Sequence, residues 1–101
     1  MTTIPLRLDH DHLIATTPSG DWLVDTGAPT SFGRTQPELG IGEEPVESGY
    51  MGLDAEMLGE LTGVSVVGLL GADILSLRDL TFDVLGGELT FGSSDASESW
   101  L

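Results

Sequence analysis

The chain has no cysteine and no lysine, and its basic residues are three arginines and two histidines. Without cysteine, it cannot form disulfides, thiolate nucleophiles or cysteine-ligated metal sites. The excess of acidic residues gives a formal net charge of −14. Such a charge repels phosphate backbones and anionic lipid, so we expect neither nucleic acid nor membrane as a partner. It also fits a surface suited to high salt, where screening removes the self-repulsion.

Long apolar runs are missing as well. The longest apolar stretch, 64–75, is interrupted by serine, glycine and aspartate and is too short to span a bilayer. The first residues lack the basic and apolar segments of a signal peptide, so the cytoplasm is the expected location. A hydrophobic content of 40% in 101 residues fits one globular domain with one modest core. A chain of this size is too small for a deep, self-contained cleft, so a large ligand site needs a partner subunit.

Short apolar segments separated by Gly, Pro, Asp and Ser favour a mainly β domain. The predicted strands are 4–9, 13–17, 22–24, a valine-rich stretch 64–70, and a hairpin of 80–84 and 88–91 around two glycines. The domain is expected to cover 1–91, followed by an acidic, Ser-rich tail over 92–101. Trp22 is assigned to the core.

The middle of the chain follows other patterns. Segment 36–49 is rich in proline, glycine and glutamate and is predicted to be an irregular, solvated loop. Asp54 is a helix N-cap before apolar residues up to Leu61, and Gly63 ends that helix. A second helical turn is predicted over 72–77, where Asp73 lies at a position suited to capping.

Three segments in a fixed order carry the functional hypothesis. An apolar strand ends in Asp25-Thr26-Gly27-Ala28, about forty residues later comes Gly-Leu-Leu-Gly-Ala-Asp (68–73), and the glycine hairpin closes the order. Together they resemble one lobe of the aspartic proteases, in particular the single-lobe retropepsin-like family. The resemblance covers roughly residues 4–91. It implies a mainly β, closed-barrel lobe with one or two short helices.

The resemblance also implies roles for individual residues. Asp25 from each of two chains would form a water-activating pair in a homodimer, with a peptide or unfolded protein as substrate and no cofactor or metal. Thr26 would form a hydrogen bond between subunits, and Gly27 would allow close backbone approach. Leu70, Gly71 and Asp73 would support the Asp25 loop.

The sequence departs from the retropepsin pattern beside the catalytic motif and in the flap region. Pro29 follows Ala28 in a region expected to bind substrate, and proline removes one backbone donor. The Asp25–Gly71 spacing is shorter than in retroviral enzymes, which points to a reduced flap, the hairpin that closes over the peptide. Segment 46–52 is either a stunted flap, with Gly49 and Gly52 as hinges and Tyr50 facing the substrate, or a plain loop. The plain loop is the favoured interpretation.

These departures leave two functions open. The first is an aspartic endopeptidase assembled across a homodimer. The alternative is a catalytically weak or inactive, flapless domain that keeps the fold for binding or dimerisation; a monomer could not form the Asp25 pair. The stretch Asp9-His10-Asp11-His12 is interpreted as a solvated turn rather than a metal site, because it has too few ligands.

Overall fold

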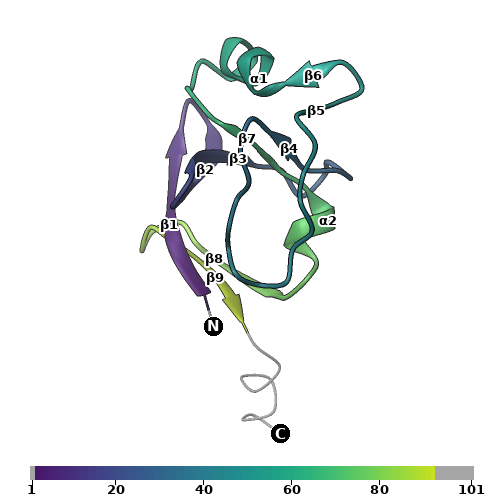
Figure 1. The fold of residues 1–101 in the computed structure, drawn as a ribbon. Helices are drawn as coiled ribbons and strands as arrows, with labels where there is room; N and C mark the ends of the chain where they lie inside the picture. Colours follow the sequence, from purple (N-terminus) through teal and green to yellow (C-terminus); the bar gives the residue numbers. More distant parts are fainter. Residues whose placement is uncertain (1, 93–101) are drawn as a thin grey trace, which may run out of the picture.

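The structure is a computed structural model that describes residues 2–92 (Figure 1). The described part is mainly β, as predicted. Its elements in chain order are β1 (Thr2–Asp9), β2 (His12–Thr17), β3 (Gly20–Val24), β4 (Phe32–Gly33), β5 (Gly49–Tyr50), β6 (Leu53–Asp54), α1 (Ala55–Thr62), β7 (Gly68–Leu70), α2 (Ala72–Leu75), β8 (Asp79–Asp83) and β9 (Glu88–Gly92).

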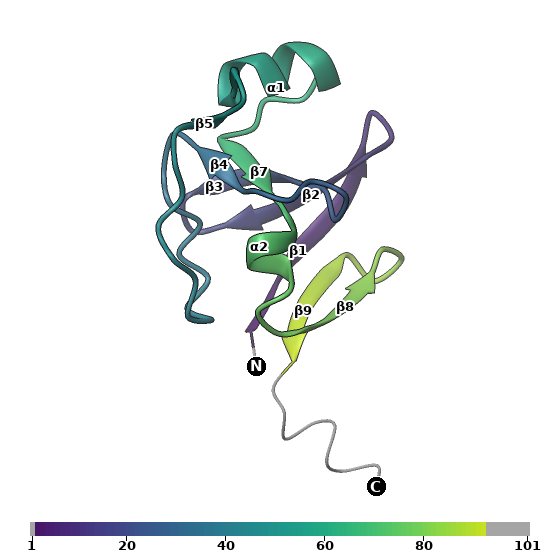
Figure 2. The same ribbon diagram turned by 90° about the vertical axis from the view of Figure 1, so that its right-hand side faces the viewer.

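Most strands belong to one seven-stranded sheet in the order β4-β7-β3-β2-β1-β9-β8. The pairs are antiparallel except β3–β7, which is parallel. The two outermost strands, β4 and β8, do not pair with each other. The expectation of a closed barrel is therefore wrong: the sheet is open, with α1 at one end and the β8–β9 hairpin at the other (Figures 1 and 2).

The centre of the sheet is covered on both faces. One cluster of buried residues includes Leu6, Ala15, Trp22, Leu70 and Phe91, and the other includes Ile14, Leu23, Leu69 and Leu58 of α1. Neighbouring residues on a strand point to opposite faces, so β3 contributes Trp22 to one cluster and Leu23 to the other. The short strand before Asp25 is thus held from both sides.

Trp22 is fully buried, as predicted, and its ring occupies space that two glycines leave free. A side-chain carbon built on Gly68 would lie 2.5 Å from Trp22 Cζ3, and one on Gly33 would lie 2.7 Å from Trp22 Cη2. The indole Nε1 donates a hydrogen bond to Ser19 Oγ at 3.2 Å. Glycine at these two positions lets β4 and β7 approach the ring.

The segment 36–47 is irregular, as predicted, but it is not simply a solvated loop. Leu39 and Ile41 are each 5% exposed and belong to the same cluster as Trp22. Gln36 fixes the ends of this loop: its Oε1 accepts from Val46 N at 2.6 Å, and its Nε2 donates to Val46 O at 3.1 Å. The loop closes the core on one side, which its polar composition does not indicate.

A carboxylate inside this loop satisfies the backbone around the two buried side chains. Glu43 Oε1 accepts from Leu39 N and, at 3.2 Å, from Gly40 N, while Oε2 accepts from Ile41 N at 3.0 Å. Burial alone would raise the pKa of the Glu43 carboxyl. The backbone N–H groups of Glu43 itself, Leu39, Ile41 and Gly40 outweigh that effect, so its pKa lies below the ordinary value of 4.5.

The other local predictions have mixed outcomes. The first helix begins after Asp54, whose Oδ1 accepts from Met57 N at 3.0 Å, and it ends at Gly63 with a left-handed φ of 76°. The β8–β9 hairpin is confirmed. The predicted strand over 64–70 is too long, since only Gly68–Leu70 pairs. Val64 and Val66 are buried there under α1 instead.

The predicted tail over 92–101 lies outside the described residues except for Gly92, which is the last residue of β9. The domain boundary therefore extends by at least one residue. Within residues 2–92, no helix is long and apolar enough to cross a membrane.

Candidate active site

Asp25 follows β3 directly and lies beside the end of β7. The parallel register pairs Val24 with Leu70, and Asp25 N donates to Leu70 O at 3.0 Å. The two segments singled out in the sequence are therefore adjacent, although they are more than forty residues apart. Asp25, Thr26 and Gly27 are exposed, whereas Leu70 is fully buried. A buried strand pair thus presents an exposed carboxylate.

The loop after β3 is ordered by its own backbone. Gly27 N donates to Asp25 Oδ1 at 2.9 Å, and Ala28 N donates to Asp25 O at 3.2 Å. Ala72 N, at the start of α2, donates to Ala28 O at 2.7 Å. The first of these bonds holds Asp25 Oδ1 in place, and the other two order the backbone of the loop. Within residues 2–92, the Thr26 side chain makes no hydrogen bond.

Ser31 connects this loop to the Gly-Leu-Leu-Gly segment. Its hydroxyl is almost fully buried, accepts from Gly71 N at 2.7 Å and donates to Asp73 Oδ1 at 2.6 Å. Asp73 Oδ1 also accepts from Ser31 N at 2.9 Å. Sequence reasoning missed Ser31, because a single serine in a loop carries no signal of a partner forty residues away.

Asp73 does not act as the expected helix cap. The N-cap position of α2 is Gly71, which makes no side-chain hydrogen bond, and Asp73 lies inside the first turn. Its carboxylate instead receives the two bonds from Ser31 and one from Ile74 N at 2.9 Å. Asp73 therefore ties α2 to the loop that carries Asp25.

Gly71 is restricted by space rather than by backbone angle, since its φ of −106° is open to any residue. A side-chain carbon built there would lie 2.7 Å from Ala28 O and 3.0 Å from the Thr30 carbonyl carbon. Both neighbours are backbone atoms of the Asp25 loop, so they cannot move aside as a flexible side chain would. Only glycine allows this contact.

A short hairpin lies between the Asp25 loop and α1 in the sequence. Gly49 pairs with Asp54 and Tyr50 with Leu53. Its tip is Met51-Gly52, with φ values of 50° and 82°, the left-handed pair typical of a two-residue hairpin turn. The favoured interpretation of 46–52 as a plain loop is therefore wrong. The segment is a reduced hairpin, with Met51 84% exposed at its tip.

The structure brings some of the expected substrate-contacting residues to one cluster. Ala28 and Tyr50 both pack, partly buried, against the cluster that contains Phe32 and Leu58. Pro29 is exposed and Gly49 partly so. A side-chain carbon on Gly49 would lie 2.5 Å from Leu53 O, so glycine there permits the tight hairpin.

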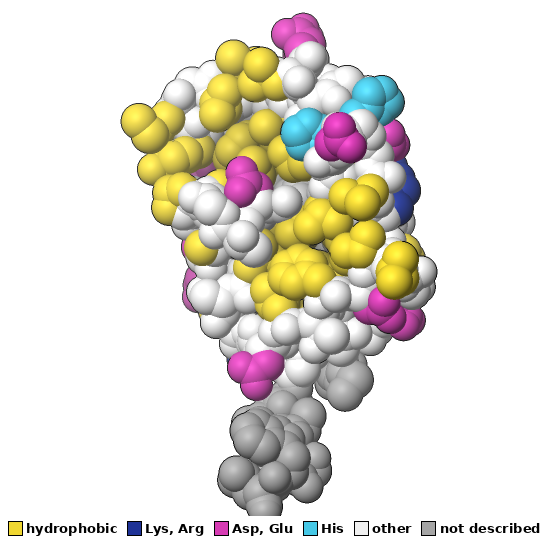
Figure 3. Space-filling model, turned by 180° about the vertical axis from the view of Figure 1, so that it is seen from behind, with side chains coloured by type: hydrophobic (Ala, Val, Ile, Leu, Met, Phe, Trp, Pro, Cys, Tyr) yellow, Lys and Arg dark blue, Asp and Glu magenta, His cyan; other side chains and the backbone are white. Residues whose placement is uncertain are grey.

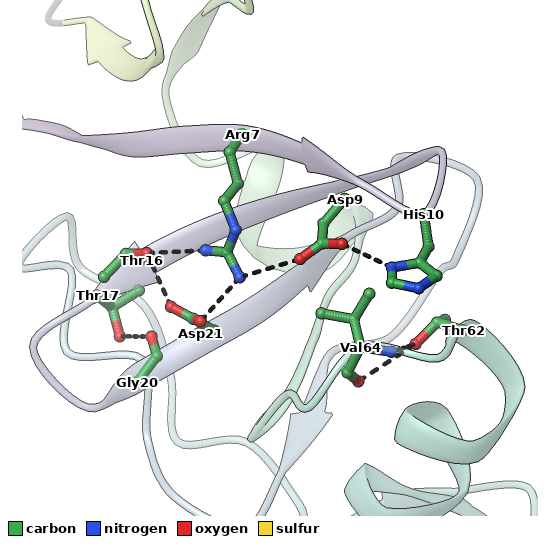
Figure 4. A network of polar contacts seen from close by, with 9 residues as sticks. All are labelled: Arg7, Asp9, His10, Thr16, Thr17, Gly20, Asp21, Thr62 and Val64. Atoms are coloured by element: carbon green, nitrogen blue, oxygen red, sulfur yellow. Dashed lines mark hydrogen bonds and ion pairs between the residues drawn. The ribbon is translucent and has the colours of Figure 1, made fainter.

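A polar network joins β1, β2 and β3, the last of which leads directly to Asp25 (Figure 4). Arg7 of β1 donates to Asp21 Oδ2 of β3 at 3.0 Å, and Thr16 of β2 donates to Asp21 Oδ1 at 2.8 Å. Burial alone would raise the pKa of Asp21, but the hydrogen bonds from Thr16 and Arg7 and the arginine charge bring its pKa below the ordinary value. The network lies at the surface, so we expect a modest contribution to stability.

The two histidines lie at the turn between β1 and β2. His10 Nδ1 lies 2.6 Å from Asp9 Oδ1 in the turn between β1 and β2, where His10 and Asp11 both have positive φ. The His10 ring packs beside Gly63 at the end of α1. Among residues 2–92, no group of three or more His, Cys, Asp or Glu side chains could hold a metal ion.

Comparison with known proteins gives no assignment: no family model, no curated protein and no solved structure matches this chain.

Proposed function

We propose that this chain is a retropepsin-like aspartic endopeptidase that hydrolyses peptide bonds as a homodimer. The observation that carries the proposal is the exposed Asp25 carboxylate, fixed in a backbone loop that is braced by Gly71, Ser31 and Asp73. A pair of such carboxylates needs rigid supports, because each must stay close to its twin throughout the reaction.

The chemistry requires two copies of Asp25. Two adjacent carboxyl groups share one proton, because two negative charges at close range repel each other and only one of the groups ionises. The ionised carboxylate takes a proton from the attacking water, and the protonated one donates to the carbonyl oxygen of the scissile peptide. The free Thr26 hydroxyl suits the bond between subunits that the resemblance implies. Activity is expected to favour acidic pH, where the shared proton is present.

The reduced hairpin of β5 and β6 would cover the substrate less than a full flap. The site therefore admits more water, and we expect slow cleavage that favours unfolded chains. The same feature favours the second candidate, a weak or inactive domain that binds or dimerises without turnover. Neither function requires a cofactor.

The test is cleavage of a diverse peptide mixture, read by mass spectrometry from acidic to neutral pH at low and high salt. Cuts made by the wild type and lost in Asp25→Asn would support the peptidase, and their positions would give its preference. The matched control is Asp11→Asn, an exposed aspartate in the β1–β2 turn, which should cleave like the wild type. If a folded dimer makes no cuts that depend on Asp25, the peptidase proposal is wrong and the binding function stands.

A further inference from the structure

One edge of the main sheet is open. Within residues 2–92, β8 has β9 as its single neighbour, so the other side of its backbone is unpaired. The strand at the opposite edge, β4, has only two residues and is covered: Phe32 forms a bridge with Glu47, and Gly33 N donates to Glu47 O at 2.8 Å. An open edge of five residues is long enough to receive another strand.

The two faces of β8 differ in chemistry. Leu80 and Phe82 lie opposite Phe91 and Leu89 on the face that holds the core. Phe91 and Leu89 are covered, but Phe82 remains 37% exposed. Apolar side chains also gather in patches on the surface in Figure 3, with acidic ones among them. The core therefore ends at β8 with an apolar side chain that a further strand would cover.

The other face of β8 is acidic. Asp79, Thr81 and Asp83 alternate with the apolar pair and are exposed, and Asp83 lies opposite Glu88 of β9. No ion pair within residues 2–92 involves these carboxylates. Arg78, just before the strand, instead donates from Nη1 to Leu77 O at 2.9 Å.

We propose that the β8 edge binds an extended peptide segment in which basic and apolar residues alternate. Such a segment would add an eighth strand, with its apolar side chains beside Leu80 and Phe82 and its basic ones opposite Asp79 and Asp83. This accessory site does not depend on the proposed peptidase activity.

Charge selects this occupant over two others. A second copy brings a further net charge of −14, and an antiparallel pairing centred on Thr81 would place Asp79 against Asp83 of the other copy. The chain's own residues 93–101 carry Asp95 and Glu98 and no basic residue. The carboxylates of Asp79 and Asp83 repel both of these acidic segments, whereas they attract a segment with basic side chains.

The experiment measures binding of a fluorescent peptide of alternating lysine and valine to the full chain by anisotropy. It is run on the wild type and on Asp25→Asn, so that cleavage does not consume the probe. We expect the lysine peptide to bind and its glutamate counterpart not to bind. Asp79→Asn/Asp83→Asn should weaken binding about 2- to 30-fold, the range for two opposite-charge cross-strand pairs. Asparagine keeps the Asp83 oxygen that accepts from Gly86 N at 2.7 Å.

The matched control is Glu44→Gln/Glu60→Gln, which removes the same charge from two exposed sites on other elements and should leave binding nearly unchanged. Bound peptide should also slow amide hydrogen exchange over 79–83. Equal losses in the two double variants would overturn the proposal, since attraction would then depend on net charge alone. Unchanged exchange over 79–83, or protection there from self-association of the free chain, would also overturn it.

Discussion

Replacing Ser31 with alanine tests whether the loop that carries Asp25 is held by a single hydroxyl. Ser31 is 1% exposed, and its Oγ bonds to Gly71 N at 2.7 Å and to Asp73 Oδ1 at 2.6 Å. Alanine removes that oxygen without changing the backbone preference much. The buried Gly71 N–H then has no partner, and Asp73 keeps only its bonds to backbone N–H groups.

The expected cost follows from these two losses. An orphaned buried donor costs about 1–3 kcal/mol, and a lost bond to a carboxylate about 1.5–3 kcal/mol. The two losses share one atom and are not additive, so we expect the free energy of unfolding to fall by about 2–4 kcal/mol. At about 4–8 °C per kcal/mol for a domain of this size, the melting temperature should fall by at least about 8 °C.

Urea unfolding followed by far-ultraviolet circular dichroism measures this change directly. Ser65→Ala is the matched control, because Ser65 is an exposed serine of the segment before β7, and it should stay within about 0.5 kcal/mol of the wild type. If Ser31→Ala is as stable as Ser65→Ala, the hydroxyl does not brace the loop and the support assigned to Asp25 is wrong.

Two further predictions concern the same architecture. Gly71→Ala should lower the free energy of unfolding by about 1–3 kcal/mol, because the new carbon meets backbone atoms of the Asp25 loop. Gly59→Ala in α1 should raise it by about 0.5–1 kcal/mol, because the new carbon lies 3.5 Å from Val64 O, an ordinary contact. Thermal melts of both variants measure the two changes. Glu43→Gln should lower the free energy of unfolding by about 1–2 kcal/mol at neutral pH, and this variant should lose less further stability than the wild type below pH 4.5. Urea melts measure both effects, with Glu44→Gln at an exposed position as the control.

Local signals in the sequence predicted the elements that local chemistry decides. Asp54 and Gly63 bound α1, since an N-cap and a left-handed glycine act within a few residues. Two glycines between alternating strands located the β8–β9 hairpin. The position of Asp25 beside Gly71 was also anticipated, but through a family resemblance rather than through physical chemistry.

What the sequence did not predict depends on contacts between distant segments. Ser31 and Asp73 are 42 residues apart, and no property of either residue indicates the other. Leu39 and Ile41 lie in a polar segment and enter the core because Glu43 and Gln36 satisfy the backbone around them. The two edge strands of the sheet, β4 and β8, do not pair with each other, and strand patterns alone do not determine this.

A fall in pH is expected to have two opposite effects on this protein: it raises the proposed activity and lowers the stability of the fold. The proposed Asp25 pair needs a shared proton and so gains activity as the pH falls. Glu43 and Asp21 have folded-state pKa values below their unfolded ones, so their contribution to stability is fully present above the unfolded pKa and is lost as the pH falls through the folded values. For Glu43 that loss begins near 4.5 and loosens the loop that closes the core. Peptidase activity is therefore expected to rise as the pH falls and to decline again at pH values below 4.5, where this loss of stability begins.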